Sequence, residues 1–304
     1  MKRTVKKAFW NLFTKGLGGI IWAVCGVLGV AYAGDQGCTT RPQTVWFAQE
    51  TWTEIRQDLS CGFTTIIIPV GGTEQSGPYI AVGKHNERVR VLAERIAKRV
   101  GHTLVAPVIA YVPEGGIAPR TGHMRFPGTI TIPEDVFERL VISIAESLRV
   151  QGFSLVVLLG DHGGYQEELR HIAQRLEPFW ERSGARILYV PEFYNVIPNR
   201  YAWWLRQQGY GADIGRHAGL SDTSLMLAAN ASMVRQEALR HAPAPSARDG
   251  IYGGNPARSS AALGQMGLSM QVDAAVRVIE TAQSQNIQNM GVMGIIRRDL
   301  MPHK

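Results

Sequence analysis

Cysteine is scarce in this chain, which has three among its 304 residues. The three form no C-x-x-C pair and no cysteine–histidine spacing of the kind that holds structural zinc, which argues against a thiolate metal centre. Cys25 lies inside an apolar N-terminal run, so Cys38 and Cys61 are the two that remain if that run is removed. A disulfide between them and a pair of free thiols both fit the sequence.

Several catalytic and nucleotide-binding motifs are also missing. No Walker sequence and no dinucleotide fingerprint occurs in residues 34–304, which argues against the common nucleotide-binding sites. A G-x-S-x-G elbow occurs nowhere, so a serine hydrolase that uses Ser76 or Ser224 is disfavoured. Residues 34–304 also contain no internal repeat and no dividing linker, which predicts a single domain over that range.

Acidic residues are missing from the first 33 positions, and this explains most of the charge imbalance. The formal net charge is +7, and residues 1–33 contribute five basic residues and no acid. Taking five from seven leaves a charge of +2 for residues 34–304. A basic face that would attract nucleic acid is therefore not indicated, and we expect no nucleic-acid partner.

Residues 1–33 are typical of an export signal. A cationic start is followed by an apolar run from about Leu17, which ends in the A-x-A sequence Ala31-Tyr32-Ala33. This pattern predicts cleavage before Gly34 and a periplasmic or secreted protein. An uncleaved membrane anchor is the alternative, although the run is short for a comfortable span.

Apolar strand-like runs alternate with amphipathic segments in residues 34–304. Strands are expected at Thr64–Val70, Thr103–Ala110, Thr129–Ile132, Phe153–Leu159 and Ala185–Val190. Helices are expected at Thr51–Leu59, Glu87–Val100, Pro133–Val150, Gln166–Arg182, Ser221–Ala229 and Gln271–Gln285. Segments 111–127, 191–216 and 240–262 are expected to be irregular. The alternation predicts a three-layer α/β/α sandwich with a mainly parallel central sheet.

Three polar clusters lie where expected strands end or helices begin. Glu74 follows the first strand and His85 opens the next helix, His162 follows a later strand, and His217 and Asp222 precede or open a helix. Functional groups of parallel sheets gather at the carboxyl ends of strands. Carboxylates and imidazoles are ligands for zinc and manganese, although each residue alone also fits an ordinary turn or helix start.

The chain resembles the creatininase (creatinine amidohydrolase) family in five sequence elements along about residues 60–290. These are Gly72-Thr73-Glu74-Gln75-Ser76-Gly77-Pro78 after a strand, Phe126-Pro127-Gly128-Thr129-Ile130 with His123 three positions earlier, Gly160-Asp161-His162-Gly163-Gly164, His217–Ser224, and Gly250-Ile251-Tyr252-Gly253 with Asn255-Pro256. Their order matches the order in the family. The resemblance implies the family's fold.

The resemblance also implies a metal site, which departs from the family's pattern. Members typically hold two divalent ions. Glu74 and His162 match ligand positions, and Asp222 stands where the family has a glutamate. Ser76 replaces a histidine ligand and His85 replaces the aspartate that bridges two ions. We therefore expect one ion per chain, zinc before manganese or iron, held by Glu74, His85, His162 and Asp222.

The function implied by the resemblance is hydrolysis of a cyclic or linear amide, a non-peptide C–N bond in a small molecule. A metal-activated water would attack the carbonyl, with Glu74 and His217 as catalytic residues and His217 donating a proton to the leaving nitrogen. Trp203 and Trp204 fit either a wall of the substrate site or core packing. A periplasmic protein that binds metal or ligand without turnover is the alternative, and a homo-hexamer is implied by family analogy alone.

Overall fold

A four-stranded parallel sheet of order β2-β1-β3-β4 forms the centre of the computed structural model, which describes Cys38 and residues 44–299. The strands are β1 (Thr65–Val70), β2 (Thr103–Val105), β3 (Leu155–Gly160) and β4 (Arg186–Tyr189). β1 and β3 are buried at every position because their apolar runs meet helices on both faces. Val70 pairs with Gly160, so both strands end level with each other.

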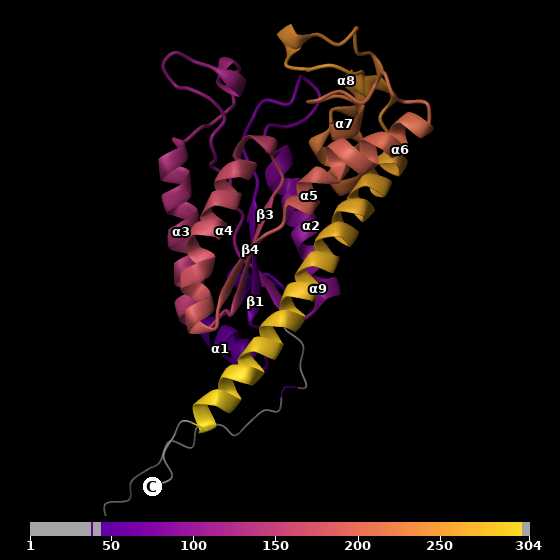
Figure 1. Ribbon diagram of the computed structural model, residues 1–304. Coiled ribbons are helices and arrows are strands. Elements are labelled where there is room, and N and C mark those ends of the chain that lie inside the picture. The colour runs from indigo at the N-terminus through magenta and orange to yellow at the C-terminus, as the bar shows by residue number, and fades with distance from the viewer. Residues whose placement is uncertain (1–37, 39–43, 300–304) are drawn as a thin grey trace, which may run out of the picture. The chain divides into compact units, whose positions relative to one another are not determined.

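Helices cover both faces of the sheet (Figure 1). One face carries α2 (Lys84–Val100), α5 (Pro191–Asn195), α7 (Leu220–Asn230) and α9 (Ala261–Asp299), and the other carries α3 (Glu134–Gln151) and α4 (Gln166–Trp180). Ile67 belongs to the first hydrophobic core, whereas its neighbours Ile66 and Ile68 belong to the second, as alternation along a strand requires. The predicted three-layer α/β/α sandwich is confirmed.

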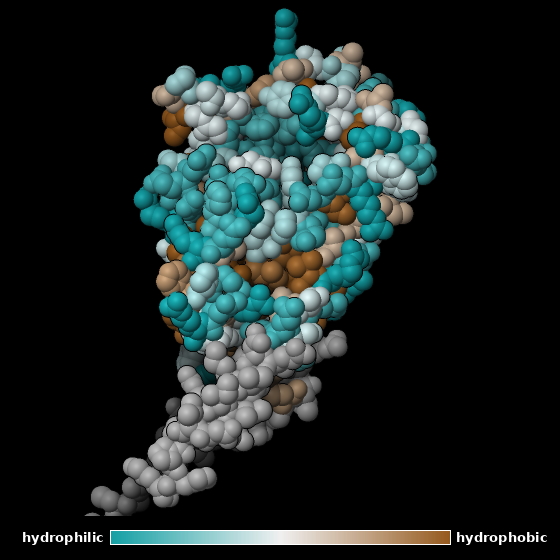
Figure 2. Space-filling view, in the orientation of Figure 1, coloured by the Kyte–Doolittle hydropathy of each residue, from teal (hydrophilic) through white to brown (hydrophobic). Residues whose placement is uncertain are grey.

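The remaining short elements surround the carboxyl ends of the strands or precede β1. α1 (Trp52–Ser60) begins at a capping box, in which the Thr51 side chain accepts from the Glu54 backbone N–H. A third core, which includes Tyr79, Ala218 and Met226, packs α7 against α8 (Gln236–Arg240). β4 is an edge strand of the sheet and is partly exposed. In the view of Figure 1 it faces the reader, and Figure 2 shows a hydrophobic strip in the same region, between hydrophilic areas.

Two expectations about helices were wrong. The segment 191–216, expected to be irregular, contains α5, a π-helix (Ile197–Tyr201) and α6 (Ala202–Gln207). α9 begins at Ala261 rather than Gln271. Gly264 lowers local helix propensity there, but it lets α9 approach α7 so closely that an added Cβ would lie 1.8 Å from the Ser224 carbonyl oxygen. Packing therefore decides where this helix begins.

Two expected strands are shorter in the structure. β2 ends at Val105 instead of Ala110, because Pro107 cannot donate to the sheet and the chain rejoins β1 only at an isolated bridge between Val70 and Ile109. The segment 129–132 forms a single bridge, from Thr131 to Val112. This part of the chain is held by side-chain hydrogen bonds, described below, instead of a ladder.

The predicted leader, residues 1–33, lies outside the described residues. Cys38 and Cys61 are both disulfide-bonded, so the free-thiol alternative does not hold. No helix in residues 44–299 is long and apolar enough to cross a membrane.

Glu50 and Asp58 form an acidic pair beside α1 that makes stability depend on pH. Burial, followed by the charge of Asp58, raises the pKa of Glu50 to about 7. Folding therefore favours protonated Glu50. The resulting contribution to the free energy of unfolding is fully present below pH 4.5 and is lost as the pH rises through about 7. We expect Glu50→Gln to gain urea resistance over the unmodified chain at about pH 8 but little at about pH 5. An equal gain in urea resistance at both pH values would contradict a raised pKa of Glu50 as its cause.

Candidate active site and metal centre

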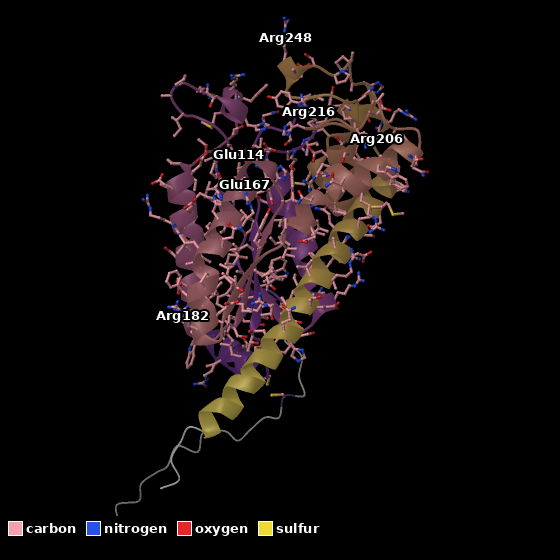
Figure 3. The ribbon with its side chains drawn as sticks, viewed as in Figure 1. Glu114, Glu167, Arg182, Arg206, Arg216 and Arg248 are labelled. Atoms are coloured by element: carbon pink, nitrogen blue, oxygen red, sulfur yellow. The ribbon has the colours of Figure 1, made fainter. Side chains whose placement is uncertain are left out.

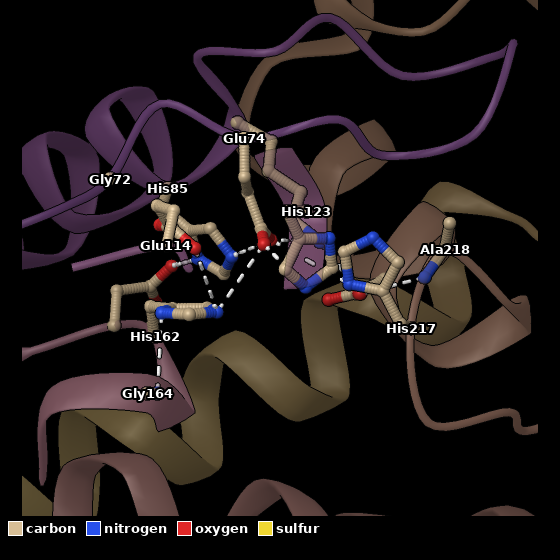
Figure 4. Close-up of polar contacts among 12 residues, drawn as sticks. Gly72, Glu74, His85, Glu114, His123, His162, Gly164, His217 and Ala218 are labelled. Atoms are coloured by element: carbon tan, nitrogen blue, oxygen red, sulfur yellow. Dashed lines mark hydrogen bonds and ion pairs between the residues drawn. The ribbon is translucent and has the colours of Figure 1, made fainter. Parts of the chain in front are cut away.

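Four of the five predicted site residues come together above the carboxyl ends of β1 and β3, namely Glu74, His85, His162 and His217 (Figure 4). Glu74 lies on the loop after β1, and His162 lies on the turn after β3. α2 begins three residues earlier than expected, so Lys84 and His85 both lie in its first turn. The side chains of Glu74, Lys84 and His85 are almost completely buried.

One carboxylate oxygen of Glu74 is held by cations and hydrogen-bond donors. Glu74 Oε1 lies 2.8 Å from His85 Nε2 and 3.3 Å from Lys84 Nζ. Burial alone would raise the pKa of Glu74, but the Lys84 ammonium and the neighbouring histidines hold it well below its ordinary range. Glu74 is therefore a carboxylate at neutral pH.

The other oxygen of Glu74 faces two imidazoles in an unusual way. Glu74 Oε2 lies 3.0 Å from His123 Nε2 and 3.3 Å from His162 Nε2. Despite these short distances, Oε2 is buried and has no partner in hydrogen-bond geometry. These three atoms are of the types that bind zinc, and they lie as close together as ligands of one ion would. His162 Nδ1 accepts from the Gly164 backbone N–H at 3.2 Å, so an ion at Nε2 would require the ring proton to move to Nδ1 and that hydrogen bond to break.

Glu114 completes this group and was not anticipated from the sequence. It is 4% exposed, and both of its carboxylate oxygens are buried without a hydrogen-bond partner. Glu114 Oε2 lies 3.7 Å from His162 Nε2. Burial and the nearby Glu74 charge raise the pKa of Glu114 to about 9, so a carboxylate here needs a cation beside it. Gly72 makes room, since a Cβ there would lie 2.8 Å from Glu114 Oε1.

The residues able to share one ion therefore differ from the predicted set. Among the described residues, one ligand atom from each of Glu74, Glu114, His123 and His162 lies within 4.8 Å of all the others. Glu74 and His162 belong to both sets. Of the predicted set, His85 and Asp222 lie outside this group, and Glu114 and His123, which were not in the predicted set, belong to it.

His85 is engaged on both ring nitrogens, which orients it beside the cluster. Its Nε2 contacts Glu74, and its Nδ1 lies 2.6 Å from Asp161 Oδ2. Asp161 also accepts from Arg88 Nε at 2.9 Å and 3.0 Å. His85 therefore links Glu74 to a buried acid–arginine pair instead of presenting a free nitrogen.

Asp222 is directed at two buried cations rather than at the cluster. Its Oδ2 lies 2.8 Å from Lys84 Nζ and accepts from the Ala218 backbone N–H at 3.0 Å. Its Oδ1 lies 3.1 Å from Arg88 Nη1. Burial opposes the charge, but Lys84 and Arg88 hold the pKa of Asp222 well below its ordinary range. Asp222 thus neutralises Lys84 and Arg88.

Tyr165, which follows the Gly163-Gly164 pair, holds the two strand ends together. Its hydroxyl lies 2.7 Å from the Val70 carbonyl and 2.6 Å from the Gly71 carbonyl, to which it donates. The same oxygen accepts from the backbone N–H groups of Asp161 and His162 at 3.2 Å and 3.1 Å. It fixes the loop after β1 against the turn that carries His162.

His217 and His123 both lie beside the Gln75 side chain. Gln75 Oε1 accepts from the Gly77 backbone N–H, and Gln75 Nε2 lies 3.0 Å from His123 Nδ1 and 3.1 Å from His217 Nε2. His217 Nε2 donates to the Gln75 backbone carbonyl at 2.9 Å, so it does not also accept from Gln75 Nε2. Burial, followed by the Lys84 charge, lowers the pKa of His217 to about 3, so this imidazole is neutral.

A cavity of about 620 Å³ opens over these groups. Its lining includes His123, His162 and His217 together with Tyr194 and Tyr252. A volume of this size suits a small molecule or the end of a peptide. Trp203 and Trp204 do not line the cavity; Trp204 stacks on Tyr201 and packs against the first core, whereas Trp203 is 60% exposed.

Glu114 and His123 both come from the Gly- and Pro-rich segment 111–127 that was expected to lie on the surface. Thr131 holds this segment by accepting from the Glu114 N–H and donating to the Gly115 carbonyl. Thr129 does the same near His123, accepting from the Gln75 N–H and donating to the His123 carbonyl. The signal in the sequence was a lone glutamate beside two glycines, which is too weak to single out a ligand.

Comparison with known proteins assigns the chain to a family. The family described as Creatininase, creatinine amidohydrolase, matches residues 48–279. A 3-dehydro-scyllo-inosose hydrolase of Thermotoga maritima is 33% identical over 125 residues, which is 40% of this chain and 37% of that protein. A mycofactocin precursor peptide peptidase of Mycobacterium tuberculosis is 27% identical, covering 70% of this chain and 83% of its own length. The first of these matches thus spans little more than a third of the relative.

Solved structures agree on the fold. A crystal structure of creatinine amidohydrolase superimposes with a TM-score of 0.66 at 20% identity, covering 79% of this chain and 98% of the other. Two further structures, described as a manganese creatininase and as a mutant creatininase of Zn-Zn type, have TM-scores of 0.61 and 0.60 at 22% identity. The family match covers most of the chain, and the chain belongs to the creatininase (creatinine amidohydrolase) family.

Proposed function

We propose that this protein is a metal-dependent hydrolase that cleaves a C–N amide bond in a small molecule. The observation that carries the proposal is the group of buried carboxylate oxygens of Glu74 and Glu114 that lack hydrogen-bond partners beside two imidazoles. Such atoms are costly to bury unless a cation binds them. The two relatives named above are a hydrolase and a peptidase, which supports hydrolysis as the reaction class.

The four residues of the cluster fit one divalent ion. Ligand atoms of a tetrahedral zinc ion lie about 3.3 Å from one another. Three of the six separations among Glu74, His123, His162 and Glu114 are 3.0, 3.3 and 3.7 Å, close to that value, and all six lie within 4.8 Å. Two imidazoles and two carboxylates favour zinc, and manganese or iron would also accept them.

The buried charges support one ion rather than two. Glu74, Glu114, Asp161 and Asp222 supply four negative charges when ionised, and Lys84 and Arg88 supply two positive charges. Two negative charges remain before His85 is counted, and His85, with a carboxylate at each ring nitrogen, adds positive charge when protonated. One divalent ion is therefore enough to balance the group. A second would leave at least two uncompensated positive charges in the same volume, which is unfavourable.

The side chains around the cluster have separable roles. A bound divalent ion would supply Lewis-acid polarisation of the carbonyl and a nucleophilic water. His217 lines the cavity and donates its Nε2 proton to the Gln75 carbonyl, so Nδ1, which lies 3.6 Å from Glu74 Oε1, has the free lone pair. Nδ1 can take a proton from the nucleophilic water and pass it to the leaving nitrogen. Gln75 positions His123 and His217, and Lys84 and His85 fix the Glu74 carboxylate.

Metal analysis combined with an amide screen tests this proposal. We expect about one zinc, manganese or iron ion per chain after purification, and hydrolysis of at least one member of a panel of cyclic and linear amides. A chelator should remove both the ion and the turnover, and the ion should restore them. Protein that binds no divalent ion would overturn the proposal, and two ions of equal affinity would overturn the one-ion assignment.

A binding protein of the same fold is the second candidate. This alternative is supported by the ion pairs of Lys84 and Arg88 with Asp161 and Asp222 inside the cavity. These pairs compensate the two carboxylate charges that a second metal ion would need. Stoichiometric metal with no turnover across the amide panel would favour it. Export to the periplasm or the outside, by way of residues 1–33, and assembly as a homo-hexamer are further proposals that a mature N-terminal sequence and a measured mass would test.

A further inference from the structure

Two arginines that line the cavity have no acidic partner. Arg206, at the end of α6, and Arg216, just before His217, both border the cavity and are exposed. Within residues 44–286, neither side chain has an ion pair or a hydrogen bond. Figure 3 labels them in the same half of the molecule as Glu114, on the side formed by α6 and α7.

The other charges of the cavity do not compensate these two. Asp161 and Asp222 are the acidic residues that line the cavity. Both form ion pairs with Arg88, and Asp222 also pairs with Lys84. Asp213, which is three residues before Arg216, is bound to Arg258 at 2.8 Å. The entrance of the cavity therefore carries two unbalanced positive charges.

We infer that the substrate amide carries an anionic group, a carboxylate or a phosphate, which Arg206 and Arg216 bind at the cavity entrance. Planar guanidinium groups suit such anions because they can donate two parallel hydrogen bonds to two oxygens. With the anion at the arginines, the amide extends into the part of the cavity lined by His123, His162 and His217. This inference rests on the proposed amide hydrolysis and narrows its substrate class.

Calorimetric binding to the metal-loaded protein tests the inference with matched probes. N-acetylglycine, its neutral carboxamide and acetamidomethylphosphonate present the same amide with a carboxylate, no charge or a phosphonate. 2-Pyrrolidone-5-carboxylate and its carboxamide form a cyclic pair. We expect at least one anionic probe to bind about 10- to 100-fold more tightly than its neutral partner.

Variants show whether the two arginines cause this preference. The double variant Arg206→Gln with Arg216→Gln should lose the preference and leave binding of the neutral probes unchanged. Arg182→Gln is the control, since Arg182 is exposed on the short helix after α4 and does not line the cavity. The inference is overturned if neutral and anionic probes bind equally, if none binds, or if the preference survives in the double variant.

Measuring binding apart from turnover separates this inference from the proposed function. Tight binding of an anionic probe without hydrolysis of any amide would leave the arginine site standing and contradict the hydrolase. Turnover of neutral amides with no preference for anionic probes would support the hydrolase and contradict the arginine site.

Discussion

Glu74→Gln is expected to lower divalent-metal affinity by more than about 100-fold, since loss of a residue that only supports a ligand already costs 10- to 100-fold. Glu74 Oε2 lies within 3.3 Å of both imidazoles of the cluster, so it would be the central ligand of an ion bound by the group. The amide that replaces the carboxylate is neutral and a weak metal ligand. The measurement is titration of metal-stripped protein by calorimetry, with metal content determined by mass spectrometry.

Glu167→Gln is the matched control for this variant. Glu167 is exposed in the first turn of α4 and pairs with Arg170, outside the cavity (Figure 3). It should bind metal as the unmodified chain does. Circular dichroism distinguishes lost binding from lost folding. A Glu74→Gln protein that is folded and binds metal with unchanged affinity would show that the ion is held elsewhere.

Lys84→Met is expected to lower the free energy of unfolding by about 3–5 kcal/mol, measured by urea titration in the presence of a chelator. The Lys84 side chain is completely buried between Glu74 and Asp222, and the shape of methionine fills its volume without its charge. The substitution leaves the buried Glu74 carboxylate and the partly buried Asp222 carboxylate with one cation fewer. Removal of one member of a buried ion-pair network is far more costly than removal of a surface pair.

The surface pair of Lys98 with Glu94 provides the comparison. Lys98 is 62% exposed, and its salt bridge spans one turn of the same helix, α2. Lys98→Met should change the free energy of unfolding by less than about 1 kcal/mol. Equal effects of the two substitutions would show that the buried network contributes no more than a surface pair.

The sheet could be predicted because its strands are apolar on both faces. The expected Phe153–Leu159 and Ala185–Val190 overlap β3 and β4, and their carboxyl ends do carry the site. Sequence periodicity does not predict the bounds of a helix where the helix propensity of its residues and their tertiary packing disagree. Gly264 and Gly267 argue against a helix from the sequence, yet they are what allows α9 to lie against α7 and Tyr201.

The candidate site could be predicted in part, and the limit has a physical cause. Glu74 and His162 follow buried strands, so strand ends alone bring them together. Glu114 and His123 reach the site through an irregular segment whose course depends on hydrogen bonds from Thr129 and Thr131. Long-range side-chain contacts of this kind produce no recognisable pattern of apolar and polar residues in the sequence. Asp222, predicted as a metal ligand, lines the cavity and pairs there with Lys84 and Arg88, which the sequence pattern did not single out.

The buried network around α2 has a consequence for how the family can diverge. Lys84 and Arg88 lie one turn apart on α2, and their partners come from the ends of β1 and β3 and from α7. No single charge in this set can be altered without leaving another uncompensated in the interior. Relatives that differ at one of these positions should therefore differ at a second in the opposite sense. Sequence divergence here should proceed by exchange of whole charge sets, with metal stoichiometry changing in the same step.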